Sequence, residues 1–200
     1  MVLTGIKDHG HGREKMFKYD KKLAYPVNIR RKDIRMAKYI ITQFGGPGGE
    51  LGAFLRYFCH KFTMPTDEGK ALLNDIAVEE MGHCEMICAM VAQLVKGATP
   101  AEMEAHGLGA NYIEHGLAVF PADSFGVPFN AGGFQSTGDP ITDLAENMAA
   151  EEKARTAYEH IIDLTDDEDL IGPLLFLRQR EIVHLARFHE LFMKYKNEGY

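Results

Sequence analysis

The chain has 200 residues, a formal net charge of −7 and a hydrophobic content of 46%, which suit one globular domain with a sizeable core. The negative charge argues against a general nucleic-acid binder. With no apolar run of about 18 residues and no apolar signal-peptide core near the N-terminus, the sequence predicts synthesis for the cytosol and no membrane span.

Residues 1–32 are predicted to form an extended N-terminal arm. The segment is basic and irregular, and Pro26 favours extended backbone around it. The regular helical pattern starts after it, so we expect one domain that covers residues 33–200.

The first helix is predicted to begin at Asp33 and to continue to about Phe62, because apolar residues recur along it at helical spacing. The run Gly45-Gly-Pro-Gly-Gly49 should break or kink this helix. Two interpretations of the run stay open. It is either a loop between two short helices, or an entry path or close backbone approach beside a site at Glu50.

The second helix is predicted to run from about Thr66 to Lys96, after a turn that contains a proline. Two ionisable residues lie within its apolar face, which consists of Leu73, Ile76, Glu80, His83, Ile87, Met90 and Leu94. Glu79 and Glu85 do not fit that face, so we interpret them as solvated or as supporting a site from outside.

Residues 97–138 are predicted to form a long crossover that is rich in glycine, proline and aromatic residues. A short helix is expected to start at Pro100. A connection of this length is needed when the two helices that it joins run in parallel. Four aromatic residues are expected to anchor the crossover to the helices or to a partner: Phe120, Phe125, Phe129 and Phe134.

The third helix is predicted to start with Asp139 as its N-cap and Pro140 as its first residue, and to continue to Ile162. Glu151 and Glu152 are both candidates for a site on this helix. The apolar spacing selects Glu151.

The fourth helix is predicted to run from about Asp169 to Tyr195, with a bend near Gly172-Pro173. The acidic turn from Thr165 to Asp169 is favourable near a helix N-terminus. Residues Lys196 to Tyr200 are expected to be frayed.

A repeat of polar residues connects the two halves of the chain. A shift of 101 residues carries Glu50, Tyr57, Glu80 and His83 onto Glu151, Tyr158, Glu181 and His184. Residues three apart share a helix face, so each Glu-x-x-His pair can direct a carboxylate and an imidazole to one point.

One Glu from each of two helices, with a Glu-x-x-His from each of two others, is the arrangement that holds two metals in a ferritin-like bundle. The sequence therefore predicts an all-α fold. It is a ferritin-like four-helix bundle with an extended N-terminal arm and a long crossover between helices two and three.

Carboxylates with imidazole suit manganese or iron. The residues leave the choice of metal open, and by symmetry alone Glu181 would be a sixth ligand. The other interpretation of the pattern is a set of amphipathic helices with salt-bridged polar residues. Cys59, Cys84 and Cys88 do not complete a zinc or iron–sulfur set, and we expect them to be buried free thiols.

The chain resembles the manganese catalases, in particular their short branch related to the spore-coat CotJC-type proteins. The resemblance covers roughly residues 20–195. The motifs that carry it are Phe44-Gly-Gly-Pro-Gly-Gly-Glu-Leu51 with Tyr57, Ala77-Val-Glu-Glu-Met-Gly-His-Cys-Glu-Met86, Ala149-Ala-Glu-Glu-Lys-Ala-Arg155 and Arg180-Glu-Ile-Val-His184.

The resemblance implies a site with two manganese ions that dismutates hydrogen peroxide to water and dioxygen. It implies five metal ligands: Glu50, Glu80, His83, Glu151 and His184. It also implies that Glu80 bridges the ions and that Glu181 carries protons instead of binding metal. Tyr57 would form hydrogen bonds within the site, and Tyr158 would play the matching part on the other side.

The resemblance further implies a homo-oligomer, expected to be a hexamer, and a location that includes the spore coat with other coat proteins as partners. Two alternatives remain. One is an oxidase or peroxidase with two iron ions in a ferritin-like bundle. The other is a structural spore-coat protein whose site is vestigial.

Overall fold

A computed structural model describes residues 22–200, and this part of the chain is almost entirely helical or irregular. Within it, an isolated bridge between Ala122 and Pro128 is the one place where extended backbone pairs. None of the described helices combines the length and the apolarity that a membrane crossing needs. The prediction of an all-α fold is confirmed.

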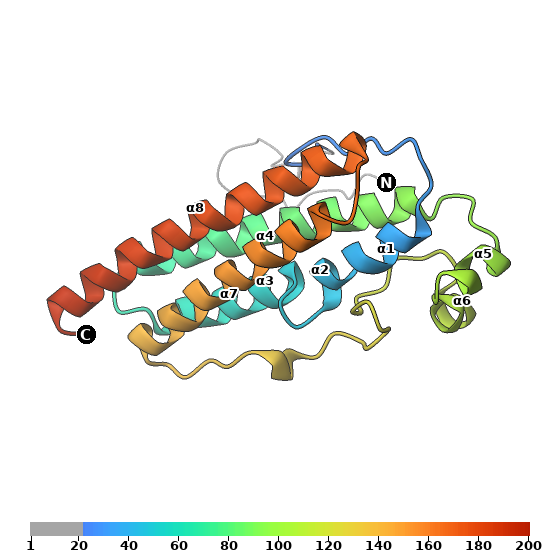
Figure 1. Ribbon diagram of the computed structural model, residues 1–200. Helices are drawn as coiled ribbons and strands as arrows, with labels where there is room; N and C mark the ends of the chain where they lie inside the picture. Colours follow the sequence, from blue (N-terminus) through green and yellow to red (C-terminus); the bar gives the residue numbers. More distant parts are fainter. Residues whose placement is uncertain (1–21) are drawn as a thin grey trace, which may run out of the picture.

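Four long helices form the bundle: α3 (Glu50–His60), α4 (Asp67–Leu94), α7 (Pro140–Ile162) and α8 (Glu168–Glu198). Helix α3 packs against α4, and α7 packs against α8, so the two halves of the repeat are two helical hairpins (Figure 1). Helices α4 and α7 run in the same direction, which is why the chain between them has to return along the molecule. This is the ferritin-like arrangement that the sequence predicts.

The predicted first helix is divided into three pieces. Helices α1 (Ile34–Ile40) and α2 (Thr42–Gly45) precede α3, and a 3-10 turn, η1 (Lys61–Thr63), follows it. The N-cap of α1 is Asp33, as predicted, and its side chain accepts a hydrogen bond from the amide of Met36.

The glycine run between α2 and α3 is a tight turn whose glycines permit close backbone packing. A Cβ atom on Gly49 would lie 2.7 Å from the carbonyl oxygen of Thr42, and one on Gly45 would lie 2.2 Å from the amide nitrogen of Ala122. The interpretation as a loop between two helices is therefore correct, and the close approaches of these glycines are to Thr42 and Ala122 and not to the site at Glu50. Because Pro121 and Ala122 cover Gly45, nothing supports an entry path at that residue.

Replacing Gly45 with alanine is expected to lower the free energy of unfolding by about 1–3 kcal/mol, because the added methyl group would displace the crossover backbone. Gly48→Ala is the matched control, since a Cβ atom there meets nothing within 4 Å. That variant should stay within about 0.5 kcal/mol of wild type. Urea denaturation of both variants checks this, and equal stabilities would contradict the close packing at Gly45.

Caps set the start of the long helices. Thr66 caps α4 and accepts a hydrogen bond from the amide of Gly69, and Asp139 caps α7 by accepting from the amide of Thr142. These N-termini lie where the sequence predicts them. Helix α4 ends at Leu94, two residues before the predicted end.

Helix α8 begins one residue earlier than predicted, with Asp167 as its N-cap, and it continues through Pro173 without ending. The expectation that Lys196 to Tyr200 are frayed is wrong for most of that segment. The helix extends to Glu198, and Gly199 ends it with a φ of +85°, a conformation that glycine adopts without strain.

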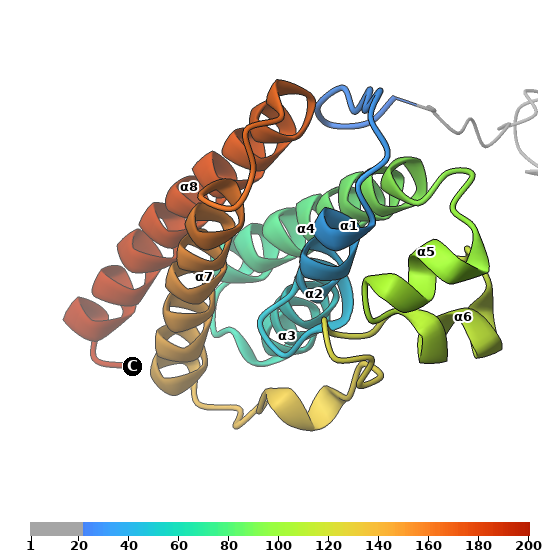
Figure 2. The ribbon, with the colours of Figure 1, turned by 45° about the vertical axis from the view of Figure 1, so that its right-hand side comes forward.

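The crossover contains the predicted short helix, α5 (Pro100–Ala105). A capping box between Thr99 and Glu102 stabilises its N-terminus. The crossover also contains α6 (Gly109–His115) and a short 3-10 turn, η2 (Ala131–Gly133), which the sequence analysis did not predict. Figure 2 shows α5 and α6 beside α1 and α4, on the side away from α7 and α8.

Three of the four crossover phenylalanines are partly buried, and Phe134 lies under the guanidinium of Arg56. Phe125 is 91% exposed, so it does not anchor the crossover to the bundle, and its anchoring to a partner stays a prediction. The end of the crossover is instead held by a polar contact. The buried His60 ring lies 2.8 Å from Asn147 Oδ1 and 2.6 Å from the carbonyl oxygen of Gln135.

The described part of the predicted arm is extended and packs on its own chain. The side-chain amide of Gln93 accepts a hydrogen bond from the amide of Ile29 and donates one to the carbonyl of Val27. The guanidinium group of Arg30 donates two hydrogen bonds to the carboxylate of Asp169 at the start of α8. The rest of the predicted arm, residues 1–21, lies outside the described residues.

Candidate metal centre

The core of the bundle has two apolar clusters with a polar layer between them. On α4, Ile76 belongs to one cluster and Ile87 to the other. On α8, Leu177 belongs to the cluster of Ile87, and Phe188 belongs to the cluster of Ile76. The polar layer lies between these positions and contains the six predicted site residues, each at most 1% exposed: Glu50, Glu80, His83, Glu151, Glu181 and His184.

The structure brings these six residues together in two overlapping groups. In each group the candidate ligand atoms all lie within 4.8 Å of one another. Both groups contain Glu80 and Glu181. One group also contains Glu50 and His83, and the other also contains Glu151 and His184. The predicted convergence in the bundle interior is therefore observed, whereas the role of each residue stays a prediction.

Glu80 is the meeting point of the two groups. His83 Nδ1 approaches Glu80 Oε2 to 2.6 Å, and His184 Nδ1 approaches Glu80 Oε1 to 2.8 Å. Glu181 occupies the equivalent position in the repeat, but its Oε1 lies 3.8 Å from His83 Nδ1. The repeat is thus symmetric in sequence and asymmetric in contacts, with both imidazoles turned to Glu80.

The two tyrosines cross over between the halves of the repeat. Tyr158 donates a hydrogen bond to Glu50 Oε1, and the charge of Glu151 contributes to the raised pKa of Tyr57. Both rings are buried. Burial is the main cause that raises the pKa of each tyrosine well above its usual range, and the charges of nearby carboxylates add to it. Each hydroxyl therefore stays protonated and available as a donor.

Burial and crowding raise the pKa of three of the carboxyl groups. For Glu50, burial and the charge of Glu80 raise the pKa to about 7. Burial is also the main cause of the raised pKa of Glu151. For Glu181, burial and the charges of Glu50, Glu80 and Glu151 raise the pKa well above the usual range.

The pKa of Glu80 moves in the opposite direction. Burial alone would raise it, but the imidazoles of His83 and His184 outweigh burial and lower the pKa to about 2. The same contacts act on the rings: burial would lower the pKa of His184, but Glu151, Glu79 and Glu80 raise it to about 11. Glu80 and Glu181 thus occupy equivalent positions of the repeat but have very different proton affinities.

The buried atoms of the site fit cations. Most of the carboxylate oxygens and all four imidazole nitrogens of the six residues have no aligned hydrogen-bond partner. Buried polar groups without a partner cost free energy, and carboxylates packed together repel. Two divalent cations would satisfy these oxygen and nitrogen atoms and offset the repulsion, and the donor set suits manganese or iron.

The sequence analysis interpreted Glu79 as either solvated or supporting a site from outside, and its contacts favour the second interpretation. Its Oε2 lies 3.1 Å from His184 Nε2, and its Oε1 lies 3.7 Å from His83 Nε2. Arg180 holds it through a contact of 2.5 Å to Oε1. Burial would raise the pKa of Glu79, but His184, His83 and Arg180 outweigh burial and keep it well below its usual range. The sequence contained a signal for this pair, because Glu79 and Arg180 are separated by the same 101 residues as the other members of the repeat.

The cysteines contribute nothing to the site within the described residues. Cys84 is buried, which raises its pKa far above the usual range, and partial burial raises the pKa of Cys88 to about 11. All three thiols are free, as predicted. The expectation that all are buried is confirmed for Cys84 only, because Cys88 is partly buried and Cys59 is exposed.

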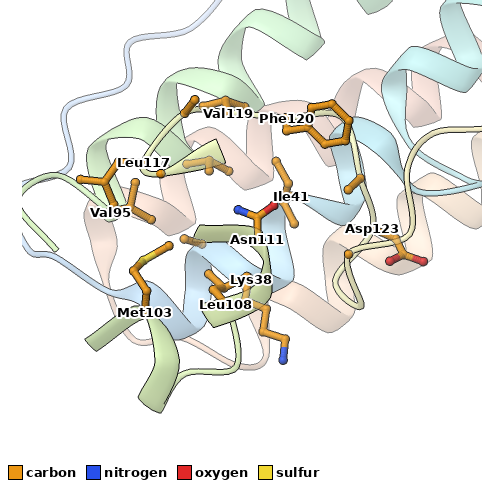
Figure 3. Close-up of a pocket in the computed structure, with 16 residues that line it drawn as sticks. Lys38, Ile41, Val95, Met103, Leu108, Asn111, Leu117, Val119, Phe120 and Asp123 are labelled. Carbon is orange, nitrogen blue, oxygen red and sulfur yellow. The ribbon is translucent and has the colours of Figure 1, made fainter. Parts of the chain in front are cut away.

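A separate pocket lies between α1, α4 and the crossover, and it contains none of the six site residues. Its wall is mainly apolar, with Val95, Met103 and Phe120, and Lys38, Asn111 and Asp123 add polar groups (Figure 3). The chemistry of the chain is therefore concentrated in the polar layer of the bundle and not in this pocket.

Comparisons with known proteins agree with the geometry. The sequence model of the family described as "Manganese containing catalase" matches residues 16–199. The chain is 49% identical to Protein CotJC of Bacillus subtilis, over 92% of this chain and 96% of that protein. It is 32% identical to a manganese catalase of Bacillus subtilis, over 88% and 71% of the two chains. Among solved structures, KatB, a manganese catalase from Anabaena, matches with a TM-score of 0.83 and 33% identity, over 90% of this chain and 81% of that one.

Proposed function

The chain belongs to the family of manganese-containing catalases, and from this we propose that it holds two manganese ions and dismutates hydrogen peroxide to water and dioxygen. The observation that carries the proposal is the convergence of four buried carboxylates and two buried imidazoles in two overlapping groups. One isolated Glu-x-x-His pair would not support it, since such a motif is short and common.

In this proposal one ion is held by Glu50 and His83 and the other by Glu151 and His184. Glu80 lies between them and serves both, in keeping with its contacts to both imidazoles. When bound, two manganese ions supply a two-electron redox centre that peroxide can oxidise and reduce in turn.

Glu181 is the proton carrier of the proposal. Dismutation takes protons from one peroxide molecule and returns protons to the other, so a carboxyl group that stays in the site can pass them on. Glu181 is buried, belongs to both groups of candidate ligands and contacts neither imidazole closely. This position supports the proposed role of Glu181, which is to receive and release a proton at one of its carboxylate oxygens.

In this scheme Tyr158 orients the carboxylate of Glu50 and Tyr57 orients that of Glu151, each of which serves one ion. Tyr158 donates to Glu50 Oε1, which leaves Oε2, an oxygen without another partner, free to bind metal. The tyrosine rings also belong to the two apolar clusters that keep bulk water out of the polar layer.

Elemental analysis joined to an oxygen-evolution assay on the same preparation tests the proposal. The protein is made in manganese-supplemented and in iron-supplemented cells, and metal content is compared with oxygen release from hydrogen peroxide. We expect about two manganese ions per chain and oxygen release in proportion to manganese. Turnover that requires iron and an electron donor would favour the di-iron alternative, and a fully metallated but inactive protein would favour the vestigial site.

Assembly and location form a second part of the proposal. We propose a homo-oligomer, with a hexamer as the expected state, and association with the spore coat, because the chain is similar to Protein CotJC over nearly its whole length. Light scattering coupled to size-exclusion chromatography measures the first, and immunodetection in spore-coat extracts measures the second. A monomer in solution, or absence from the coat, would contradict the respective part.

A further inference from the structure

Glu79 is a partly exposed residue whose carboxylate lies beside both imidazoles of the buried site. The six site side chains are at most 1% exposed, whereas the Glu79 side chain is 28% exposed. Its two oxygens face different rings: Oε2 faces His184 Nε2 at 3.1 Å, and Oε1 faces His83 Nε2 at 3.7 Å. One carboxylate therefore lies between the outer nitrogens of two histidines that are far apart in sequence.

The inner nitrogens of the same rings point to the other side. Nδ1 of His83 and Nδ1 of His184 both face Glu80, at 2.6 and 2.8 Å. An imidazole that binds a metal through one nitrogen carries its hydrogen on the other, and that hydrogen needs an acceptor. A carboxylate only accepts, so Glu79 is suited to fix both rings with Nδ1 directed inward.

We propose that Glu79 is a positioning residue shared by both halves of the metal site, with Arg180 as its counter-charge; this rests on the proposed metal centre. With metal at Nδ1, each Nε2 would carry a hydrogen, and Glu79 is the acceptor beside both rings, with Oε2 at 3.1 Å from His184 Nε2 and Oε1 at 3.7 Å from His83 Nε2. It thereby holds both rings in the orientation in which Nδ1 binds metal.

The repeat explains why the partner of Glu79 is an arginine. Position 180 is the equivalent of position 79, and the two side chains meet across the α4–α8 contact. A second carboxylate at position 180 would repel the first. Arg180 instead forms two contacts with Glu79, of 2.5 and 3.2 Å, which fix the orientation of the carboxylate and balance its charge.

Glu79→Gln tests the proposal, because glutamine has the same shape but can accept from only one imidazole. Asp75→Asn is the matched control: Asp75 pairs with Arg187 at 2.7 Å on the same two helices and contacts none of the six site residues. We expect Glu79→Gln to weaken manganese affinity about 10- to 100-fold in competition with a chelator. Asp75→Asn should change it by less than about twofold, as for an exposed ion pair.

A spectroscopic signal separates positioning from a general loss of stability. In zinc-loaded, diamagnetic protein, the Nε2–H resonances of both His83 and His184 should lie far downfield and exchange slowly with water. Glu79→Gln should shift the resonance of at least one ring upfield and speed its exchange, because the amide oxygen accepts from one ring only, and Asp75→Asn should affect neither ring. Unchanged resonances, or unchanged manganese affinity, in Glu79→Gln would overturn the proposal.

A double variant tests whether Arg180 acts through Glu79. Arg180→Met should weaken manganese affinity in the wild-type background and have no further effect in the Glu79→Gln background. An equal further loss in both backgrounds would refute the assigned role of Arg180. These readouts do not depend on turnover, so a protein without catalase activity would contradict the proposed function and leave this inference standing.

Discussion

Replacing Glu181 with glutamine is expected to leave both manganese ions in place and to lower oxygen evolution by about 10²- to 10⁴-fold, the usual contribution of a general acid–base group. Glutamine keeps the size of the side chain in a fully buried position, so the packing of α8 should not change. It cannot accept and return a proton, which is the function that we assign to Glu181.

The control for this variant is Glu190→Gln on the same helix. Glu190 is exposed and outside the polar layer, so both metal content and activity should match those of wild type. Manganese per chain and initial rates of oxygen release are measured on each preparation. Full activity in a manganese-loaded Glu181→Gln protein would remove Glu181 from the mechanism, and loss of metal would instead make it a ligand.

Replacing Glu80 with alanine is expected to abolish manganese binding and activity together. Glu80 belongs to both groups of candidate ligands, and both imidazoles turn to it. Glu50 belongs to one group only. Glu50→Ala should therefore retain about one manganese ion per chain, since the donors around Glu151 and His184 are untouched.

The comparison between these two variants tests the shared position of Glu80. Elemental analysis gives the metal content, and far-UV circular dichroism checks that the helices remain. If Glu50→Ala and Glu80→Ala lost the same amount of metal, the assignment of Glu80 as the group between the ions would be wrong.

Much of the fold could be predicted because two physical signals reinforce each other. The apolar spacing placed α4, α7 and α8 on the sequence to within a few residues, and the polar residues inside that spacing identified the site. A buried carboxylate is costly without a partner, so its presence in an apolar face is informative. The shift of 101 residues then showed that the two halves fold as equivalent hairpins.

The crossover could not be predicted in the same detail. Helix α6 has no buried residue, so it lacks the apolar face by which a helix is recognised. Phe125 is aromatic and yet almost fully exposed, and the contacts that hold the end of the crossover come from the buried polar side chains of His60 and Asn147. Such contacts depend on how distant segments meet.

Glu79 shows the limit of the periodicity argument at the site itself. It lies beside the apolar face of α4 and remains partly exposed, so spacing alone leaves open whether it is solvated or supports the site. Its importance comes from the approach of α8, which brings His184 and Arg180 to it. The repeat could have indicated this pair, because opposite charges at equivalent positions of two packed helices favour contact.

The central claim is that two manganese ions lie in the polar layer, on either side of Glu80. Diffraction data collected on both sides of the manganese absorption edge, from crystals of manganese-loaded protein, test it most directly. We predict two anomalous peaks that vanish below the edge, one between Glu50 and His83 and one between Glu151 and His184. A single peak, peaks that appear only above the iron edge, or metal bound elsewhere on the chain would contradict the claim.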